Sequence, residues 1–142
     1  MKASNSRYSS CVYFATGALA RKVERLACEA WEPVGLSPSH GYLLLMVLDE
    51  PGIQPNKLVK ELLLSPSTIT RLADKLELKK LVQRTSEGKV IKIFPTAKAR
   101  ALEPEMKACM GCFAEKYCEI LGSEDCSMLT AALNKVTDKL SD

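Results

Sequence analysis

The sequence predicts a mainly α-helical protein with a small β-wing, built around a winged helix-turn-helix core. Within residues 52–80, two segments with helical spacing follow each other across a tight turn, and each begins at a proline. Two β-type runs joined by a polar turn come directly after them. Segments with an apolar stripe flank this core on both sides. Helix, turn, helix and β-ribbon in this order make DNA the first partner to consider.

Length and composition are typical of one domain. The 142 residues carry a formal net charge of +3, and 46% are hydrophobic, which is enough for a packed core. A mild positive charge permits nucleic-acid binding but does not establish it. No apolar run approaches the length of a transmembrane helix, and the N-terminal segment carries charge where a signal peptide is apolar. We therefore expect a cytoplasmic protein with no membrane partner, whose six cysteines are thiols or ligands and not disulfides.

Two helices are expected before the core. Apolar residues spaced by three and four predict the first from about residue 8 to residue 31, and Pro33 and Gly35 end it. Ser37 and Pro38 form a cap and a first turn for the second. That second helix is nearly all apolar at its centre, so it is expected to cross the core.

The core itself begins with a strand of one or two residues at 53–54. Pro55 then opens a short helix with four inward-facing side chains: Leu58, Val59, Leu62 and Leu63. Ser65 and Pro66 repeat the cap-and-proline start, and the next helix is expected to run to about residue 79 or 80.

Two long helices are expected after the core. Thr96 is predicted to cap a helix of roughly 25 residues, and Pro104 should bend or locally open it. Gly122 ends this helix, and Ser123 is predicted to cap a last helix with one apolar stripe. The apolar stripes of the flanking helices exceed what a small monomer can bury, so a two-fold dimer built from them is expected.

The second helix of the core carries the predicted DNA-reading face. Its buried face is predicted to hold Ile69, Leu72, Ala73 and Leu76. The opposite side is polar or basic, and Arg71 can contact guanine O6 and N7 together. Asp74 could accept from cytosine or hold Arg71 in place. The DNA-contacting candidates on this helix are Ser65, Ser67, Thr68, Thr70, Arg71 and Lys75.

A β-hairpin is predicted from alternating residues at 81–85 and 89–94. It adds the DNA-contacting candidates Arg84, Lys89 and Lys92, in a position where a wing follows the minor groove or the backbone. From Lys75 to Lys92 six basic residues stand against Glu77 and Glu87, a local balance of +4 that exceeds the +3 of the whole chain. The basic charge is thus concentrated at the predicted DNA surface, although a polar helix face taken alone is more often simply solvated.

Three stretches resemble the MarR family of bacterial winged helix-turn-helix transcriptional regulators. They are LLLMVLDEPG at 43–52, SPSTITRLADKLELKKLVQR at 65–84 and PTAKARAL at 95–102, so the resemblance covers about residues 36–102. The family's Ser-Thr-x-Thr-Arg start of the recognition helix corresponds to Ser67, Thr68, Thr70 and Arg71. Its Leu-Glu-x-x-Gly-Leu-Val-x-Arg stretch is matched by Leu76, Glu77, Leu81, Val82 and Arg84.

The chain also departs from the family pattern. Lys80 stands where the family has a glycine, and Ala99 stands where it has another after the wing. The wing is short and has Glu87-Gly88-Lys89 in place of an acidic-Arg-Arg signature. Because lysine suits a narrow groove less well than arginine, these departures put the minor-groove contact of the wing in question.

The resemblance implies a domain plan and a function. Residues 1–142 form one domain, with a DNA-binding lobe at 36–100 and dimerisation helices at 7–33 and 97–141. The implied protein is a homodimer that binds a pseudo-palindromic double-stranded DNA operator and represses nearby genes. Family members respond to small aromatic ligands, to oxidants through cysteine, or to metal. We therefore expect a repressor that a small-molecule effector or an oxidant releases.

Cysteines supply the alternative hypothesis, a redox or metal sensor whose DNA binding is secondary or lost. Cys11 lies between Tyr8 and Tyr13 and is the candidate redox sensor, since some family members sense peroxide through a cysteine near tyrosines in the first helix. Cys109 and Cys112 could share a metal with Cys118 or Cys126, but ordinary helix packing is the favoured explanation, and with His40 as the one histidine no metal or other cofactor is assigned. A winged helix that binds protein and not DNA is a third hypothesis.

Enzymatic activity is not expected. The sequence has no glycine-rich phosphate loop, no paired acid cluster and no second histidine to serve a cysteine nucleophile.

Overall fold

The computed structural model describes residues 1–141 and consists of helices with one two-stranded sheet. A 3-10 turn at Ala3–Asn5 precedes the first α-helix. The α-helices are α1 (Val12–Trp31), α2 (Pro38–Asp49), α3 (Pro55–Leu62), α4 (Pro66–Leu78), α5 (Ala97–Leu121) and α6 (Ser123–Lys139). The strands are β1 (Val82–Glu87) and β2 (Val90–Pro95), and a second 3-10 turn, Glu32–Val34, follows α1. The predicted mainly α-helical winged fold is therefore confirmed.

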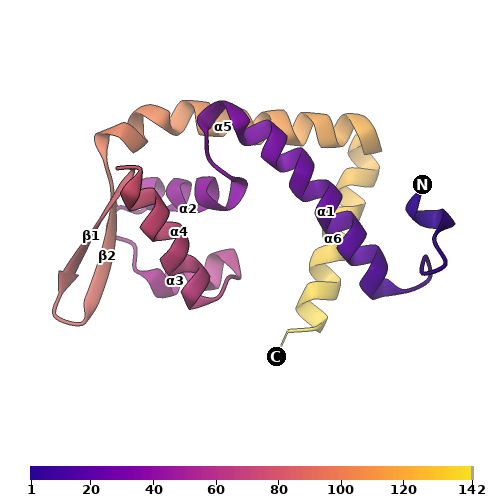
Figure 1. Ribbon diagram of the computed structural model, residues 1–142, viewed down its shortest axis with the longest axis horizontal. Helices are drawn as coiled ribbons and strands as arrows, with labels where there is room; N and C mark the ends of the chain where they lie inside the picture. Colours follow the sequence, from indigo (N-terminus) through magenta and orange to yellow (C-terminus); the bar gives the residue numbers. More distant parts are fainter. Residues whose placement is uncertain (142) are drawn as a thin grey trace.

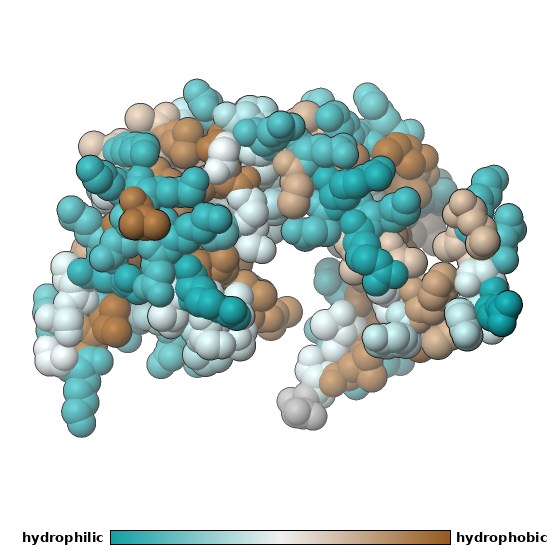
Figure 2. All heavy atoms as spheres, viewed as in Figure 1, coloured by the Kyte–Doolittle hydropathy of each residue, from teal (hydrophilic) through white to brown (hydrophobic). Residues whose placement is uncertain are grey.

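The elements form two groups joined by α5, which runs along the upper edge of the molecule in Figure 1. The winged lobe comprises α2, α3, α4, β1 and β2 and lies under the beginning of α5. The arm helices, α1 and α6, lie toward the other end of α5. The space-filling view shows a hollow between the lower parts of these two groups (Figure 2).

One hydrophobic core lies in the winged lobe and reaches α5. Leu43, Leu44 and Val47 of α2 are fully buried, as the apolar centre of that helix predicts. Trp31 at the end of α1 is also buried and packs against α2 at Gly41. A Cβ at Gly41 would come within 2.2–2.8 Å of three atoms of the Trp31 ring, so α2 can approach the indole only because residue 41 has no side chain.

The sheet is an antiparallel hairpin whose register pairs Val82 with Pro95 and Glu87 with Val90. Gly88 in the turn has a φ of +65°, a conformation that glycine adopts without steric cost. Ile53 forms an isolated bridge with Ile93, which confirms the very short strand predicted at residues 53–54. The base of the hairpin is buried at Val82 and Ile93, and its tip is exposed.

Several predicted boundaries are wrong. The first helix begins at Val12 and not near Tyr8, because the serine-rich segment before it uses local hydrogen bonds, such as Tyr8 N–H to the Ser6 hydroxyl at 3.2 Å. Ser123 does not cap α6: Gly122 is already the boundary of both helices, and Ser123 is the first helical residue. Leu63 does not face inward; a left-handed φ of +53° turns its side chain outward, and it is 78% exposed.

Helix α5 begins as predicted. The Thr96 hydroxyl accepts a hydrogen bond from Ala99 N–H at 3.3 Å and donates to the Lys80 carbonyl at 2.8 Å, which joins the helix start to the end of α4. Pro104 lies inside α5, and the helix continues without a break, so the local opening predicted there is not observed. No helix within residues 1–141 is long and apolar enough to cross a membrane.

Replacing Gly41 with alanine should destabilise the protein by about 1–3 kcal/mol, because the new methyl group overpacks against the rigid Trp31 ring. Gly111→Ala is the matched control, since a Cβ there meets nothing within 4 Å inside α5 and should add about 0.5–1 kcal/mol. Denaturant unfolding measures both changes, and equal stability of the two variants would contradict the packing described.

Candidate nucleic-acid interface

Helices α3 and α4 are joined by a tight turn that begins at Leu63 in the left-handed conformation. Ser65 then caps α4, since its hydroxyl accepts from Thr68 N–H at 3.2 Å. The same hydroxyl lies 2.8 Å from the Thr68 hydroxyl and 3.2 Å from that of Ser67. The positive end of α4 therefore carries three clustered hydroxyl groups, the arrangement that favours a phosphate or a base acceptor.

The two faces of α4 are separated as the sequence predicts. Its buried residues are Ile69, Leu72, Ala73 and Leu76. Ser67, Arg71 and Lys75 are exposed and form one ridge on the other side, spaced by four. Thr70 is exposed as well, and its hydroxyl donates to the Pro66 carbonyl at 3.0 Å. We call the ridge Ser67–Arg71–Lys75 the α4 ridge.

Arg84 of β1 forms two ion pairs within the chain. Its guanidinium contacts Asp74 at 2.7 Å and Glu77 at 2.6 Å, and its side chain is only 28% exposed. The hydrogen bond to Glu77 raises the pKa of Arg84 above its ordinary value, and Asp74 adds to the effect. The predicted Asp74–Arg71 contact is not formed; Asp74 holds Arg84, and the base of the wing is thereby joined to α4.

The remaining wing lysines differ in their surroundings. Lys89 lies in the exposed turn, whereas Lys92 is half-buried and 3.6 Å from Glu87. A shallow groove of about 230 Å³ between the start of α3 and the wing is lined by Lys89 together with Gln54 and Asn56. These two polar residues were not among the predicted site residues. The polar Gln-Pro-Asn start of α3 can be recognised in the sequence, but its position beside the wing is evident only from the fold.

Two lysines near α4 donate hydrogen bonds to backbone carbonyls of the same chain. The Lys79 ammonium donates to the Gly35 carbonyl at 3.4 Å, and Lys98 donates to the Lys79 carbonyl at 2.9 Å. Burial lowers the pKa of His40 in α2, and the positive charges of Lys75 and Lys79 near it lower this pKa further. The basic charge counted in the sequence is therefore only partly available to a ligand.

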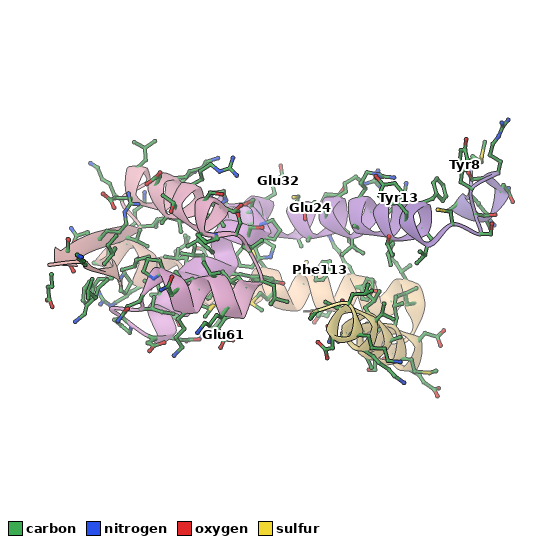
Figure 3. The ribbon with its side chains drawn as sticks, turned by 90° about the horizontal axis from the view of Figure 1, so that it is seen from below. Tyr8, Tyr13, Glu24, Glu32, Glu61 and Phe113 are labelled. Atoms are coloured by element: carbon green, nitrogen blue, oxygen red, sulfur yellow. The ribbon has the colours of Figure 1, made fainter. Side chains whose placement is uncertain are left out.

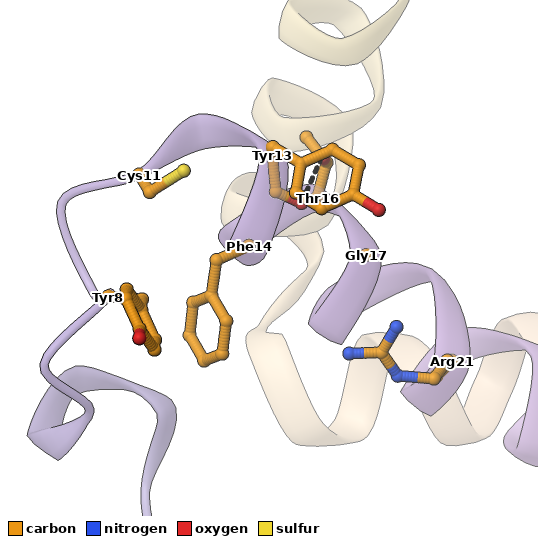
Figure 4. Close-up of a pocket in the computed structure, with 7 residues that line it drawn as sticks. All are labelled: Tyr8, Cys11, Tyr13, Phe14, Thr16, Gly17 and Arg21. Atoms are coloured by element: carbon orange, nitrogen blue, oxygen red, sulfur yellow. Dashed lines mark hydrogen bonds between the residues drawn. The ribbon is translucent and has the colours of Figure 1, made fainter.

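The cysteines are divided among different surroundings. Cys11 is exposed and lines a pocket of about 420 Å³ with Tyr8, Tyr13, Phe14 and Arg21, at the start of α1 (Figure 4). Cys109 is buried in α5, where burial raises the pKa of its thiol. Within residues 1–141 no three His, Cys, Asp or Glu side chains gather as metal ligands, so the Cys109–Cys112 pair is not joined by Cys118 or Cys126.

The packing of α3 and α4 against the hairpin defines a winged helix-turn-helix protein. Residues 34–89 match the MarR family. Over 127 residues the chain is 28% identical to the HTH-type transcriptional repressor MdtR of Bacillus subtilis (strain 168), covering 87% of this chain and 79% of that protein. These matches make residues 34–89 similar to the MarR family and most of the chain similar to a transcriptional repressor.

Solved structures share the whole fold. Bordetella bronchiseptica BpsR, whose DNA binding is regulated by 6-hydroxynicotinic acid, superposes with a TM-score of 0.84 at 16% identity, covering 96% of this chain and 99% of that one. MepR of S. aureus, solved as a DNA complex, superposes with a TM-score of 0.79 at 19% identity, covering 92% and 98%. At these identities the likeness concerns the fold.

The structure explains why a glycine suits the position of Lys80, where the family pattern has one. Lys80 has a φ of +61°, and its N–H donates to the Glu77 carbonyl at 2.9 Å as the chain leaves α4. Glycine adopts this left-handed conformation without the Cβ clash that a lysine suffers. The turn into the wing therefore has a conformation that favours glycine but is occupied by a lysine.

Lys80→Gly should accordingly stabilise the protein by about 0.5–1 kcal/mol, the relieved backbone strain being partly offset by greater freedom of the unfolded chain. Lys79→Gly is the control, because Lys79 has an ordinary φ of −79° and its ammonium holds the Gly35 carbonyl, so no gain is expected. Thermal unfolding measures the Tm of both variants. A Tm of Lys80→Gly at or below that of the parent would show that the backbone at residue 80 is not strained.

Proposed function

We propose that the protein is a homodimeric repressor that binds a pseudo-palindromic double-stranded DNA operator through α4 and the wing, and that a small effector or an oxidant releases it. The observation that carries the proposal is the α4 ridge, which is exposed on the side of α4 opposite its buried face. Because a bacterial operator lies in the cytoplasm, the protein would act there.

The DNA-contacting residues fall into two groups by their role. Ser67, Arg71 and Lys75, which are exposed, would read or approach a major groove, with Ser65, Thr68 and Thr70 beside them at the helix start. Lys89 and Lys92 would supply charge along the backbone from the wing. Arg84 contributes chiefly by holding the wing against α4, since both of its ion pairs are internal.

The arm helices support a dimer. Helix α6 has no buried residue, and α1 has buried residues only at its end, Ala30 and Trp31. Large exposed apolar side chains lie along α1, α5 and α6: Val12, Tyr13, Ile120, Met128, Leu133 and Val136. Figure 3 places Tyr13 far along α1 from the winged lobe, where Glu61 lies. An isologous contact between two copies would remove these surfaces from water.

An effector site is available among the same helices. A cavity of about 330 Å³ is lined by α1, α5 and α6 and is almost entirely apolar. Phe113 and Tyr117 stack in its wall, with ring centroids 5.8 Å apart, and Leu19 and Leu133 face it from α1 and α6. Flat aromatic walls suit a small aromatic ligand. BpsR, with the same fold, is regulated by an aromatic acid.

The oxidant branch of the proposal rests on Cys11, whose exposed thiol shares a pocket with Tyr8 and Tyr13. If DNA binding were lost or secondary, this thiol would instead make the protein a redox sensor. Salt-dependent binding to operator DNA separates the two hypotheses, because phosphate neutralisation gives a slope on the order of −0.9 per phosphate in a plot of log affinity against log salt.

Arg71→Ala should weaken operator binding by about 1–3 kcal/mol, with the loss concentrated at one base pair in each half-site. Genome-wide selection of bound fragments supplies the operator, and titration against single-base variants measures the effect. Arg25→Ala on α1 removes another exposed arginine and should bind like the parent. Parental affinity in Arg71→Ala would remove α4 from the proposed reading surface.

Val136→Glu should convert the dimer to monomer and abolish tight operator binding, because a carboxylate in an apolar contact costs about 2 kcal/mol or more. Asn134→Glu adds the same charge on the other side of α6 and should remain dimeric. Sedimentation equilibrium of both variants gives the answer, and a Val136→Glu protein that stays dimeric would exclude this face of α6 from the interface.

A further inference from the structure

The corner between α5 and α6 brings two cysteines together. Cys118 lies in the last turn of α5 and Cys126 in the first turn of α6, with their sulfur atoms hydrogen bonded at 3.3 Å. Gly122 makes the corner possible, with a φ of +83°. Its N–H donates to the Cys118 carbonyl at 2.7 Å, and its carbonyl accepts from Cys126 N–H at 3.0 Å.

This contact differs from that of the other cysteine pair. Cys109 and Cys112 are three residues apart on one helix, where Cβ atoms are about 5–6 Å apart and exceed the 3.5–4.5 Å that a disulfide needs. Cys118 and Cys126 come from two helices that meet at an angle, so their sulfur atoms point toward each other and lie in contact. Both thiols are half-buried, which leaves them within reach of a small reagent.

We propose that Cys118 and Cys126 form a two-thiol oxidation site at which a hydroperoxide produces an intrachain disulfide. One thiolate attacks the peroxide, breaks the O–O bond and becomes a sulfenic acid, while the other peroxide oxygen leaves as water or an alcohol. The second sulfur then displaces the sulfenic oxygen as water and forms the S–S bond. Two thiols and one peroxide give one disulfide; each sulfur is oxidised by one electron and the peroxide is reduced by two.

The surroundings of the two thiols also affect the rate of disulfide formation. The hydrogen bond with Cys118, and then burial, raise the pKa of Cys126. A thiol with a raised pKa is less ionised at neutral pH, and the thiolate is the reactive form. Disulfide formation should therefore be slow near pH 7 and speed up as the pH rises through the thiol range.

The bond would act on the arm helix α6. Because α6 has no buried residue, its direction is set mainly at its junction with α5. A covalent link across nine residues would fix that junction and restrict the unfolded chain. Tyr117, next to Cys118, lines the apolar cavity between the arm helices, so the oxidation site adjoins the proposed effector site without depending on it.

The test uses the full chain, treated with hydrogen peroxide, alkylated and digested with trypsin. Cleavage after Lys107, Lys116 and Lys135 places Cys109 and Cys112 in one peptide and Cys118 and Cys126 in the next, which gives an internal control. We expect the 117–135 peptide to lose about 2 Da and resist alkylation, and the 108–116 peptide to keep two alkylated thiols. Further cleavage after Glu119 should leave two fragments joined until a reductant is added.

Variants complete the experiment. Cys126→Ser and Cys118→Ser should each abolish the loss of mass, whereas Cys28→Ser should leave it unchanged. Oxidation should also raise the Tm of the parent by a few degrees and leave both corner variants unaffected. A disulfide between chains, a bond to another cysteine, or sulfinic acid at either position without a disulfide would overturn the proposal.

Discussion

The contact between Trp31 and Gly41 is the constraint on which the rest of the structure depends. Trp31 ends α1, and its indole is buried against α2 and stacks edge-to-face with Tyr42 at 6.0 Å. Helix α2 in turn packs on α4, α5 and β2. Helix α1 thus meets the winged lobe at a rigid aromatic side chain, and α2 connects that contact to α4.

The polar surface is organised by a second, smaller constraint. Arg84 joins the wing to the side of α4 through Asp74 and Glu77, while Thr96 joins the start of α5 to the end of α4 at Lys80. Helix α4 and the wing are therefore fixed to each other by contacts within the chain. In the proposed DNA complex, pre-organised contacts of this kind would lower the entropy lost on binding.

Local chemistry explains which features could be predicted from the sequence. The caps at Ser37, Ser65 and Thr96 depend on neighbours within three residues, and all three hold in the structure. The buried face of α4 follows from helical periodicity. The surroundings of Leu63 and Ser123 differ from the prediction because the backbone handedness at Leu63 and at Gly122 decides them, and the residue types at 63 and 123 do not reveal it. The partners of Arg84 come from another element, so spacing along the chain could not identify them.

Helix α6 has a consequence for how the protein behaves at the concentrations of a cell. A helix of 17 residues with no fully buried side chain gains little stability from packing, and without such packing helices of ordinary sequence are marginal in water. Its order must come from whatever covers it, and a cover supplied by a second molecule obeys mass action. Folding of the C-terminal arm would then depend on copy number: a scarce regulator would be partly frayed and open to proteolysis, and an abundant one would be fully ordered. The amount of protein would itself be a control on its activity and lifetime.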